Sequence, residues 1–571
     1  MANYFKIASV FTVLMMPGAL AFADILPGGA QPAQINRAMI APQINNLTPP
    51  GSGDTITVTA SPETRLANGA DKIKFKLNGI ILVGNNVFST EKLSRIYQAD
   101  LHHTISLQRL LEIVQTITNV YRAHGYVLTR AILPVQKAKN GIVRIDIVEG
   151  KIDKVIVTGD PKKSARLVQK FGNKIAQSSP LQLAALEKYT LLANEIPGTE
   201  VQSVLTASPD MYGATDLYLQ TKHQNITGYI SYDNYRTRYI GPQQITANLT
   251  ANSFLMSGDT GQVTVAKTPK GNELTFFNAS YDLPINAEGD RFLIGGIHDK
   301  THPLFVLQPY DINGTDDNYY GTFSFPVLRT PQQNLTVYLN ANYENTDVTT
   351  FHQKLYTDQI RSIGLGASYN LIDRFGGANS MYADIRQGLP ILGYTSNTNP
   401  ATAMTSRPGG HAVYTKIDMA VSRLQPLFAH LSLYALLKGQ YGFQTLLAAE
   451  QFPYGGMELG RGYDIAELLG DRAIAGTFEG RFDWDVNRLY LSKLQFYAFY
   501  DYGKVWNLFF VSNLPLNQSA TSTGVGVRFF FNNYVSGNFT WAQPLTKQVA
   551  AEELIGRGRK PRAFFSLVAY M

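Results

Sequence analysis

From about residue 224 to its end, the chain alternates apolar and polar residues in one segment after another, and this pattern restricts the possible folds more than any other feature. In the stretch 334–344, one face would carry Leu335, Val337, Leu339, Ala341 and Tyr343. The opposite face would carry mainly asparagine, threonine and tyrosine. Such a period of two indicates β-strands. Because lipid requires apolar side chains and a watery lumen tolerates polar ones, long alternating segments between turns are typical of a transmembrane β-barrel.

The number of segments fits a closed barrel. Charged residues make up only 16% of the chain, below the roughly 25% of ordinary globular proteins, which disfavours a soluble sandwich. An even number of strands is usual in bacterial barrels, and about sixteen strands enclose an aqueous channel. We therefore predict a 16-stranded antiparallel barrel over 224–571, with strands at 226–236, 243–255, 261–269, 273–285, 290–301, 317–329, 333–348, 358–374, 378–392, 411–427, 431–443, 472–484, 493–507, 520–533, 535–545 and 561–571.

The N-terminus has the pattern of a secretory signal peptide. A lysine precedes an apolar run, Pro17-Gly18 follows, and Ala21-Phe22-Ala23 forms a cleavage site, so residues 1–23 are expected to be removed. Residues 24–71 are rich in proline, glycine, alanine and asparagine, and they indicate a linker. One short helix near residues 33–46 is expected within it, and that helix is a possible plug for the pore.

Residues 72–223 differ in character from the barrel segment and divide into two units of similar order. In the first unit, 72–150, an amphipathic helix is predicted from the period of Leu107, Leu110, Leu111, Val114, Ile117 and Tyr121. Gly125 then supplies a stop signal for that helix. Strands precede and follow it, and the same order of strand, two helices and two strands recurs over 151–223. The fold class is thus mainly β: a barrel preceded by two small α+β domains.

Several functional classes lack support in the sequence. There is no cysteine, which excludes disulfides, cysteine nucleophiles and cysteine metal ligands. No phosphate-binding loop, nucleophile elbow or His-Glu-x-x-His motif is present. We therefore expect neither an enzyme nor a cofactor or metal. The net charge of +7 does not by itself indicate a nucleic-acid partner, and none is expected.

A long loop of about 28 residues, 444–471, separates two predicted barrel strands and contains Arg461 between Gly460 and Gly462. Loops of this length are usually functional or disordered. On the wall beside it, alternation points Glu479 and Asp501 into the lumen. From the residues alone, two interpretations stay open: a loop folded into the lumen, or an exposed loop with a solvated arginine.

Particular segments of the two modules and the barrel resemble a known family. The stretches LNGIILVGNNVFSTEKL, ITNVYRAHGYVLTRAILPVQ and NGIVRIDIVEGKI resemble a POTRA (polypeptide-transport-associated) domain. The stretch GRGYD, residues 460–464, resembles a loop motif, and FEG at 478–480 and FYDYG at 499–503 resemble the barrel-wall motifs that follow it. Together they resemble the two-partner secretion transporters, outer-membrane proteins that export haemolysins and adhesins, over nearly the whole mature chain.

The resemblance implies positions for individual residues. The pore-loop motif would be Gly460, Arg461, Gly462 and Tyr463, with the loop folded into the lumen. Arg461 would meet Asp501, with Glu479 as a second candidate, and Phe478, Gly480 and Gly503 would complete the luminal face of the wall. The sequence departs from the family at Gly460, where valine is frequent, and at its last residue, Met571, where an aromatic is usual.

The resemblance also implies a function and partners. The periplasmic domains would bind an unfolded exoprotein, which then leaves through the pore without nucleotide hydrolysis; the outer-membrane lipid bilayer and lipopolysaccharide would be further partners. Strand 127–133 and the second-module helices are candidates for client binding, with Tyr126, Val127, Ile132, Leu181 and Leu186 as contact residues. Two alternatives remain, a barrel-assembly factor of the same superfamily and a solute porin or receptor.

Overall fold

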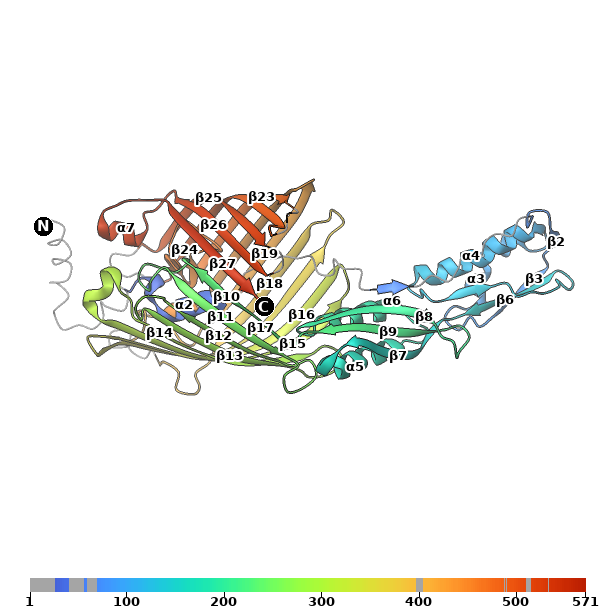
Figure 1. Cartoon of the computed structure of the whole chain (residues 1–571), viewed down its shortest axis with the longest axis horizontal. Helices are drawn as coiled ribbons and strands as arrows, with labels where there is room; N and C mark the ends of the chain where they lie inside the picture. The colour runs from blue at the N-terminus through green and yellow to red at the C-terminus, as the bar shows by residue number, and fades with distance from the viewer. Residues whose placement is uncertain are drawn as a thin grey trace.

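The computed structural model describes residues 26–40, 56–58, 69–396, 404–486, 488, 490–509, 515–531 and 534–571. The predicted signal peptide, 1–23, lies outside these residues. Figure 1 shows an elongated molecule with a β-barrel at one end and two small α+β units extending from it. We call the barrel rim opposite these units the far end.

The prediction of sixteen antiparallel strands in a closed barrel is confirmed, and β27 pairs with β10 to close it. Predicted and observed strands agree one for one and differ mainly at their ends, for example at β15, which starts at Ile312 rather than at 317. The closing strand forms although the chain ends in Met571, whose backbone N–H donates to the Gly228 carbonyl at 3.0 Å. The strands are β10 (Ile226–Asp233), β11 (Gln244–Asn252), β12 (Thr260–Lys267), β13 (Leu274–Pro284), β14 (Arg291–Thr301), β15 (Ile312–Arg329), β16 (Gln333–Thr350), β17 (Gln353–Ile372), β18 (Ala378–Gly388), β19 (Thr415–Phe428), β20 (Leu431–Gly442), β23 (Arg472–Asp485), β24 (Lys493–Trp506), β25 (Asn517–Phe531), β26 (Val535–Pro544) and β27 (Arg562–Tyr570).

The two faces of the barrel wall follow the alternation of the sequence. On β24, Phe496, Tyr500 and Tyr502 are exposed on the outside, whereas Phe499 and Asp501 between them are buried in the interior. Large apolar side chains on the outer face suit a lipid environment, and polar side chains on the inner face suit a lumen.

The first module has a mixed sheet in the strand order β3-β6-β5 and a small β2–β4 pair. Its long helix, α4 (Leu107–Ala123), starts where the Ser106 hydroxyl accepts a hydrogen bond from the Arg109 backbone N–H at 3.1 Å, a typical N-cap. One apolar face of α4 fills the module core. The other elements are β2 (Lys74–Lys76), β3 (Gly79–Val83), α3 (Thr90–Ser94), η5 (Gln98–Asp100), β4 (Thr104–Ser106), β5 (Arg130–Ile132) and β6 (Ile142–Val148).

The second module has a four-stranded sheet in the order β1-β8-β9-β7. Its outermost strand, β1 (Ile56–Val58), comes from the segment predicted as a linker and pairs in parallel with β8. This strand was not predicted from the sequence. The other elements are β7 (Lys151–Asp160), η6 (Lys162–Ser164), α5 (Ala165–Ala176), α6 (Leu183–Asn194), β8 (Thr199–Ala207) and β9 (Ala214–His223).

The expected short helix is α2 (Pro32–Ile40), which follows η4 (Gly28–Ala30) and lies inside the barrel (Figure 1). Asn36 Nδ2 donates to Asp316 Oδ2 of the wall at 2.8 Å, and Arg37 Nη2 lies 2.8 Å from Glu450 Oε1. Residues 41–46 of the predicted helix lie outside the described residues. Within the described part of the chain, every helix is too short or too polar to cross a membrane.

The turn between β13 and β14 joins the barrel to the second module through Glu288. Lys174 Nζ and Lys188 Nζ lie 2.9 and 2.7 Å from its carboxylate oxygens, and Tyr189 OH donates to it at 3.1 Å. Burial by itself raises the pKa of Glu288, but the hydrogen bonds from the two lysines and the tyrosine outweigh it and lower the pKa to about 2. Nearby, Arg329 Nε lies 2.8 Å from Glu195 Oε1 of the module. The module is thus tied to the rim by ion pairs.

This junction should respond to pH only under strongly acidic conditions. A free glutamate has a pKa of about 4.3, so the lowered pKa of docked Glu288 makes the contact fully stabilising above about pH 4.5 and progressively weaker as the pH falls toward 2. Because the side chain is 42% exposed, the effect is expected to be modest. Spin labels at Lys170 and Arg374 should report one distance distribution from pH 8 to 5 and a broader one below about pH 4.

The variant Glu288→Gln should broaden that distribution at every pH, and Glu91→Gln, on the exposed surface of the first module, serves as the control. A change in the wild-type distribution between pH 8 and 5 would contradict the assignment, because Glu288 stays ionised over that range.

Candidate functional site

The residues between β20 and β23, 443–471, form a loop that folds back into the barrel; we call it the pore loop. It contains η8 (Ala448–Glu450) and a small hairpin of β21 (Phe452–Tyr454) and β22 (Leu468–Gly470), none of which was predicted from the sequence. Tyr454, Leu459 and Tyr463 are buried against the wall. Arg461 is only 3% exposed, so the alternative of a solvated arginine in an exposed loop is wrong.

Two glycines allow the loop to reach the wall. Gly460 has φ +80°, a conformation that favours glycine. At Gly462 a Cβ would lie 2.8 Å from Pro544 N and 2.8 Å from Ser522 Cβ, so only a residue without a side chain lets the backbone approach this closely. Both positions flank Arg461 and set the direction of its side chain.

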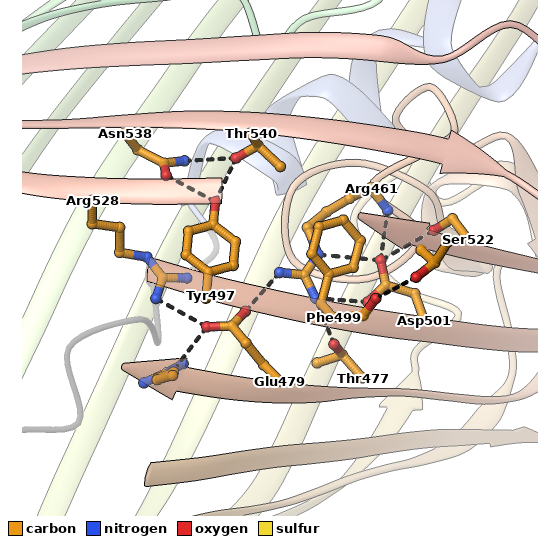
Figure 2. A network of polar contacts seen from close by, with 12 residues as sticks. Arg461, Thr477, Glu479, Tyr497, Phe499, Asp501, Ser522, Arg528, Asn538 and Thr540 are labelled. Carbon is orange, nitrogen blue, oxygen red and sulfur yellow. Dashed lines mark hydrogen bonds and ion pairs between the residues drawn. The ribbon is translucent and has the colours of Figure 1, made fainter. Parts of the chain in front are cut away.

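Arg461 is the centre of the contact between pore loop and wall (Figure 2). Its Nη2 donates to Asp501 Oδ1 at 2.8 Å and its Nε to Asp501 Oδ2 at 3.2 Å, a bidentate pair. Its Nη1 donates to Glu479 Oε2 at 2.7 Å, and Nη2 also donates to Thr477 Oγ1 at 2.6 Å. The guanidinium lies 3.4 Å from the ring centroid of Phe499. Both the planar fork and the stacking are specific to arginine.

Further cations connect Glu479 to the neighbouring strands. Arg481 Nε and Arg528 Nη1 donate to Glu479 Oε1 at 2.7 and 2.9 Å, and Arg528 lies over the ring of Tyr497 at 4.0 Å. Tyr497 OH in turn contacts Asn538 and Thr540 on β26 (Figure 2). Three arginines therefore face two carboxylates in the barrel interior, where a hydrogen-bonded network favours one arrangement of its members.

The two residues after Gly462 extend the contact across the wall. Tyr463 OH donates to the Thr521 carbonyl of β25 at 2.7 Å, and its ring lies 6.1 Å from that of Tyr454. Arg562 Nη2 of the closing strand β27 donates to Asp464 Oδ1 at 2.5 Å. The four residues 461–464 thus contact strands from β23 to β27, and β27 is the strand that closes the barrel by pairing with β10.

The predicted wall residues divide into two groups. Asp501 and Glu479 contact Arg461, and Gly503 faces inward, where a Cβ would lie 2.2 Å from the Tyr454 ring. Phe478 and Gly480 were wrongly placed in the lumen. Phe478 is 52% exposed on the outer face, and Gly480 shares that face because both flank inward-pointing Glu479 in a strand of period two.

Several residues of this site were not predicted. Thr477 and Arg481 share the inward face of β23 with Glu479, so alternation was the signal that could have found them. Arg528 and Ser522, whose hydroxyl donates to Asp501 Oδ2 at 3.2 Å, lie on β25. Alternation marks their face of the strand as the inner one too, but no motif connected them with Arg461. Among the described residues, no group of three or more His, Cys, Asp or Glu side chains could hold a metal ion.

The client-binding candidates differ in how deeply they are buried. Leu181 and Leu186 are fully buried in the core of the second module, so they are unavailable to a client, and their prediction as contacts was wrong. Tyr126, Val127 and Ile132 are half-buried. Of the predicted strand 127–133, only 130–132 is extended as β5.

Residues 213–529 match the family described as haemolysin secretion/activation protein ShlB/FhaC/HecB, and residues 75–150 match the POTRA domain of the ShlB type. The chain is 24% identical over 541 residues to the heme/hemopexin transporter protein HuxB of Haemophilus influenzae, which spans 91% of this chain and 92% of that protein. It is 20% identical over 416 residues to the outer membrane transporter CdiB of Dickeya dadantii, which spans 71% and 72%.

Two solved structures resemble the chain in fold. CdiB from Escherichia coli has a TM-score of 0.69 and 17% identity, covering 90% of this chain and 93% of that one. BamA from Haemophilus ducreyi lacking POTRA domains 1–3 has a TM-score of 0.51 and 14% identity, covering 87% and 100%. At these identities the likeness concerns the architecture of barrel and preceding domains.

Proposed function

Because the chain belongs to the haemolysin secretion/activation protein family of outer-membrane transporters, which export a partner exoprotein, we propose that it binds its partner unfolded through the POTRA modules and passes it through the barrel. The partner would be a large exoprotein of the haemolysin or adhesin type. The modules lie in the periplasm, so the far end of the barrel is extracellular. Folding of the exoprotein outside the cell would drive export, without nucleotide hydrolysis.

One observation supports this mechanism above the others: the barrel interior is occupied by two segments that are not part of its wall. The helix α2 comes from the segment before the first module, and the pore loop connects β20 with β23. Both are held inside the barrel by polar contacts, for example Arg37 to Glu450 and Arg461 to Asp501. Polar contacts of this kind can be exchanged for contacts with a client or with water. A wall built for small solutes would need neither segment, nor two modules at the rim.

The structure favours a particular edge of the first module for the client. Its sheet has the order β3-β6-β5, so β3 and β5 are the edges. At β5 the Ala131 N–H already donates to Thr118 Oγ1 at 3.0 Å. On β3, by contrast, Ile81 and Val83 are 53% and 39% exposed. An extended client segment would add to β3 through main-chain hydrogen bonds and place apolar side chains beside Ile81 and Val83.

This proposal predicts that charges on β3 block export. The double variant Ile81→Glu, Val83→Lys should lower secretion of the co-expressed exoprotein at least roughly tenfold, because charged side chains on an edge oppose strand addition. Ile73→Glu, at another exposed apolar position of the module, is the matched control. Deletion of residues 72–223 shows how much exoprotein is secreted when client binding is lost completely. Secretion by each variant is measured by immunoblot of the culture medium.

The alternatives give different outcomes in the same experiment. Secretion that survives the deletion would refute the transport mechanism. A loss of other outer-membrane barrels in the deletion strain would indicate an assembly factor instead. Normal secretion by the double variant, with loss in the deletion, would refute β3 as the docking edge only.

A further inference from the structure

Charged side chains on the outer face of the barrel are differently paired at its two ends. Near the periplasmic end, the outward-facing Arg423 has its Nη1 2.5 Å from Asp373 Oδ2. Near the extracellular end, four outward-facing cations have no carboxylate of a described residue within 4.0 Å. These are Lys267, Lys300, Arg472 and Lys504.

Two of these cations form a cluster with aromatic residues. Arg472 lies opposite Trp506 on the neighbouring strand, and Lys504 lies opposite Ile474, so the two cations are diagonal neighbours with Cα atoms roughly 7–8 Å apart. The Arg472 guanidinium lies 4.1 Å from the Tyr441 ring centroid, and Lys504 Nζ lies 5.0 Å from the Trp506 ring centroid. We call Arg472 and Lys504 the outer cation pair.

The outer cation pair lies at the height of a membrane interface. From Phe496 to Trp506, both on the outer face of β24, the strand rises roughly 33 Å, which is about 25 Å along the membrane normal at the usual tilt of about 40°. That height equals the apolar band of a transmembrane barrel. Tyr441 and Trp506 are then members of the extracellular aromatic girdle, and the cations are at the boundary between acyl chains and headgroups.

The geometry leaves the charge of Arg472 available to a ligand. Its Nε donates to the Gly442 carbonyl at 3.1 Å, and the stacking on Tyr441 holds the plane of the guanidinium. The two terminal nitrogens can then donate in parallel to a phosphate, and Lys504 adds a second charge beside it. At the boundary between acyl chains and headgroups a cation costs little, and an anionic headgroup there would bind it favourably.

We propose that the outer cation pair binds a phosphate group of lipopolysaccharide, the phosphorylated glycolipid of the outer leaflet. The site faces the bilayer rather than the lumen, so its ligand arrives by lateral diffusion in the membrane. It is independent of the client-binding mechanism proposed above.

Binding of bisphosphorylated lipid A to the purified full-length protein in non-ionic detergent tests the proposal, with native mass spectrometry as the readout. The double variant Arg472→Gln, Lys504→Gln should bind lipid A roughly tenfold to thirtyfold more weakly, as expected for two basic side chains at a charged headgroup. Arg423→Gln, which removes an outward-facing but already paired cation, should keep the wild-type affinity. Dephosphorylated lipid A should bind the wild type as weakly as lipid A binds the double variant.

Three outcomes would overturn the proposal: equal binding by the double variant, equal binding of dephosphorylated lipid A, or displacement of lipid A by millimolar inorganic phosphate, which would indicate a general anion site. Heat-modifiable mobility in gels verifies that each variant barrel is folded. If the double variant does not fold, Lys504→Gln alone should show a loss of roughly fivefold, and an unchanged affinity of that single variant would equally refute the site.

Discussion

Arg461→Ala is expected to impair export severely while the barrel still inserts into the outer membrane. The change removes four side-chain hydrogen bonds to Asp501, Glu479 and Thr477 and the stacking on Phe499. Asp501, which is fully buried, would lose its ion-pair partner, and breaking a buried pair costs roughly 3–5 kcal/mol. We expect the pore loop to leave the wall and the secreted exoprotein to fall at least roughly tenfold, measured in the culture medium.

Matched variants separate loss of the ion pair from loss of the fold. Arg374→Ala, at an exposed turn, should secrete normally, and Arg461→Lys should be intermediate because lysine keeps the charge without the planar fork. Charge reversal at Asp501 should resemble Arg461→Ala, and the swap Arg461→Asp with Asp501→Arg should restore part of the export. Normal secretion by Arg461→Ala would show that the motif is not needed for export.

Removal of α2 is expected to leave the barrel persistently conducting. Within the lumen, α2 contacts the wall through Asn36 and the pore loop through Gln34 and Arg37, and sixteen strands without a plug enclose an aqueous channel. Deletion of residues 26–40 should therefore produce sustained ion currents in planar bilayers where the intact protein shows brief or no openings.

A single charge reversal in α2 should weaken the plug without removing it. Arg37→Glu replaces an attraction to buried Glu450 by repulsion, and Arg37 is 25% exposed at its side chain. We therefore expect a loss of roughly 1–3 kcal/mol, which lowers the ratio of plugged to open molecules roughly fivefold to 150-fold. Arg37→Lys, with its charge retained, should conduct like the wild type. Unchanged conductance in the deletion variant would mean that the pore loop alone closes the channel.

The barrel was predictable because its signal is local. Each strand is specified by a period of two in its own residues, and the requirement for lipid on one side makes that period visible over the whole chain. The ends of strands were less certain, as at β15, because the portions beyond the membrane need not alternate between apolar and polar.

The pore loop could be predicted in part. Alternation already pointed Glu479 and Asp501 inward, and it placed Phe478 on the opposite face from Glu479. Phe478 and Gly480 were nevertheless assigned to the lumen, because the FEG motif was given more weight than the alternation. The ion pair of Asp464 with Arg562 joins residues 98 positions apart. No pattern within either segment indicates such a pairing.

Burial in the modules was the least predictable feature. Leu181 and Leu186 are apolar residues on or near a helix, and the same pattern suits both a module core and an exposed groove. Only the packing of α5 and α6 on the sheet decides between them. The strand β1 was missed for a similar reason, because three residues have no detectable period and owe their conformation to β8.

The position of β1 limits how far α2 can travel. The helix ends at Ile40 and the strand begins at Ile56, so the segment between them, fully extended, reaches at most roughly 55 Å. As long as β1 stays paired with β8, a helix that leaves the barrel on the periplasmic side remains within that radius of the second module. Its return is then a search within a small volume, with a high effective concentration, rather than diffusion through the periplasm. The plug would behave as a tethered ligand that re-enters its site after each client has passed.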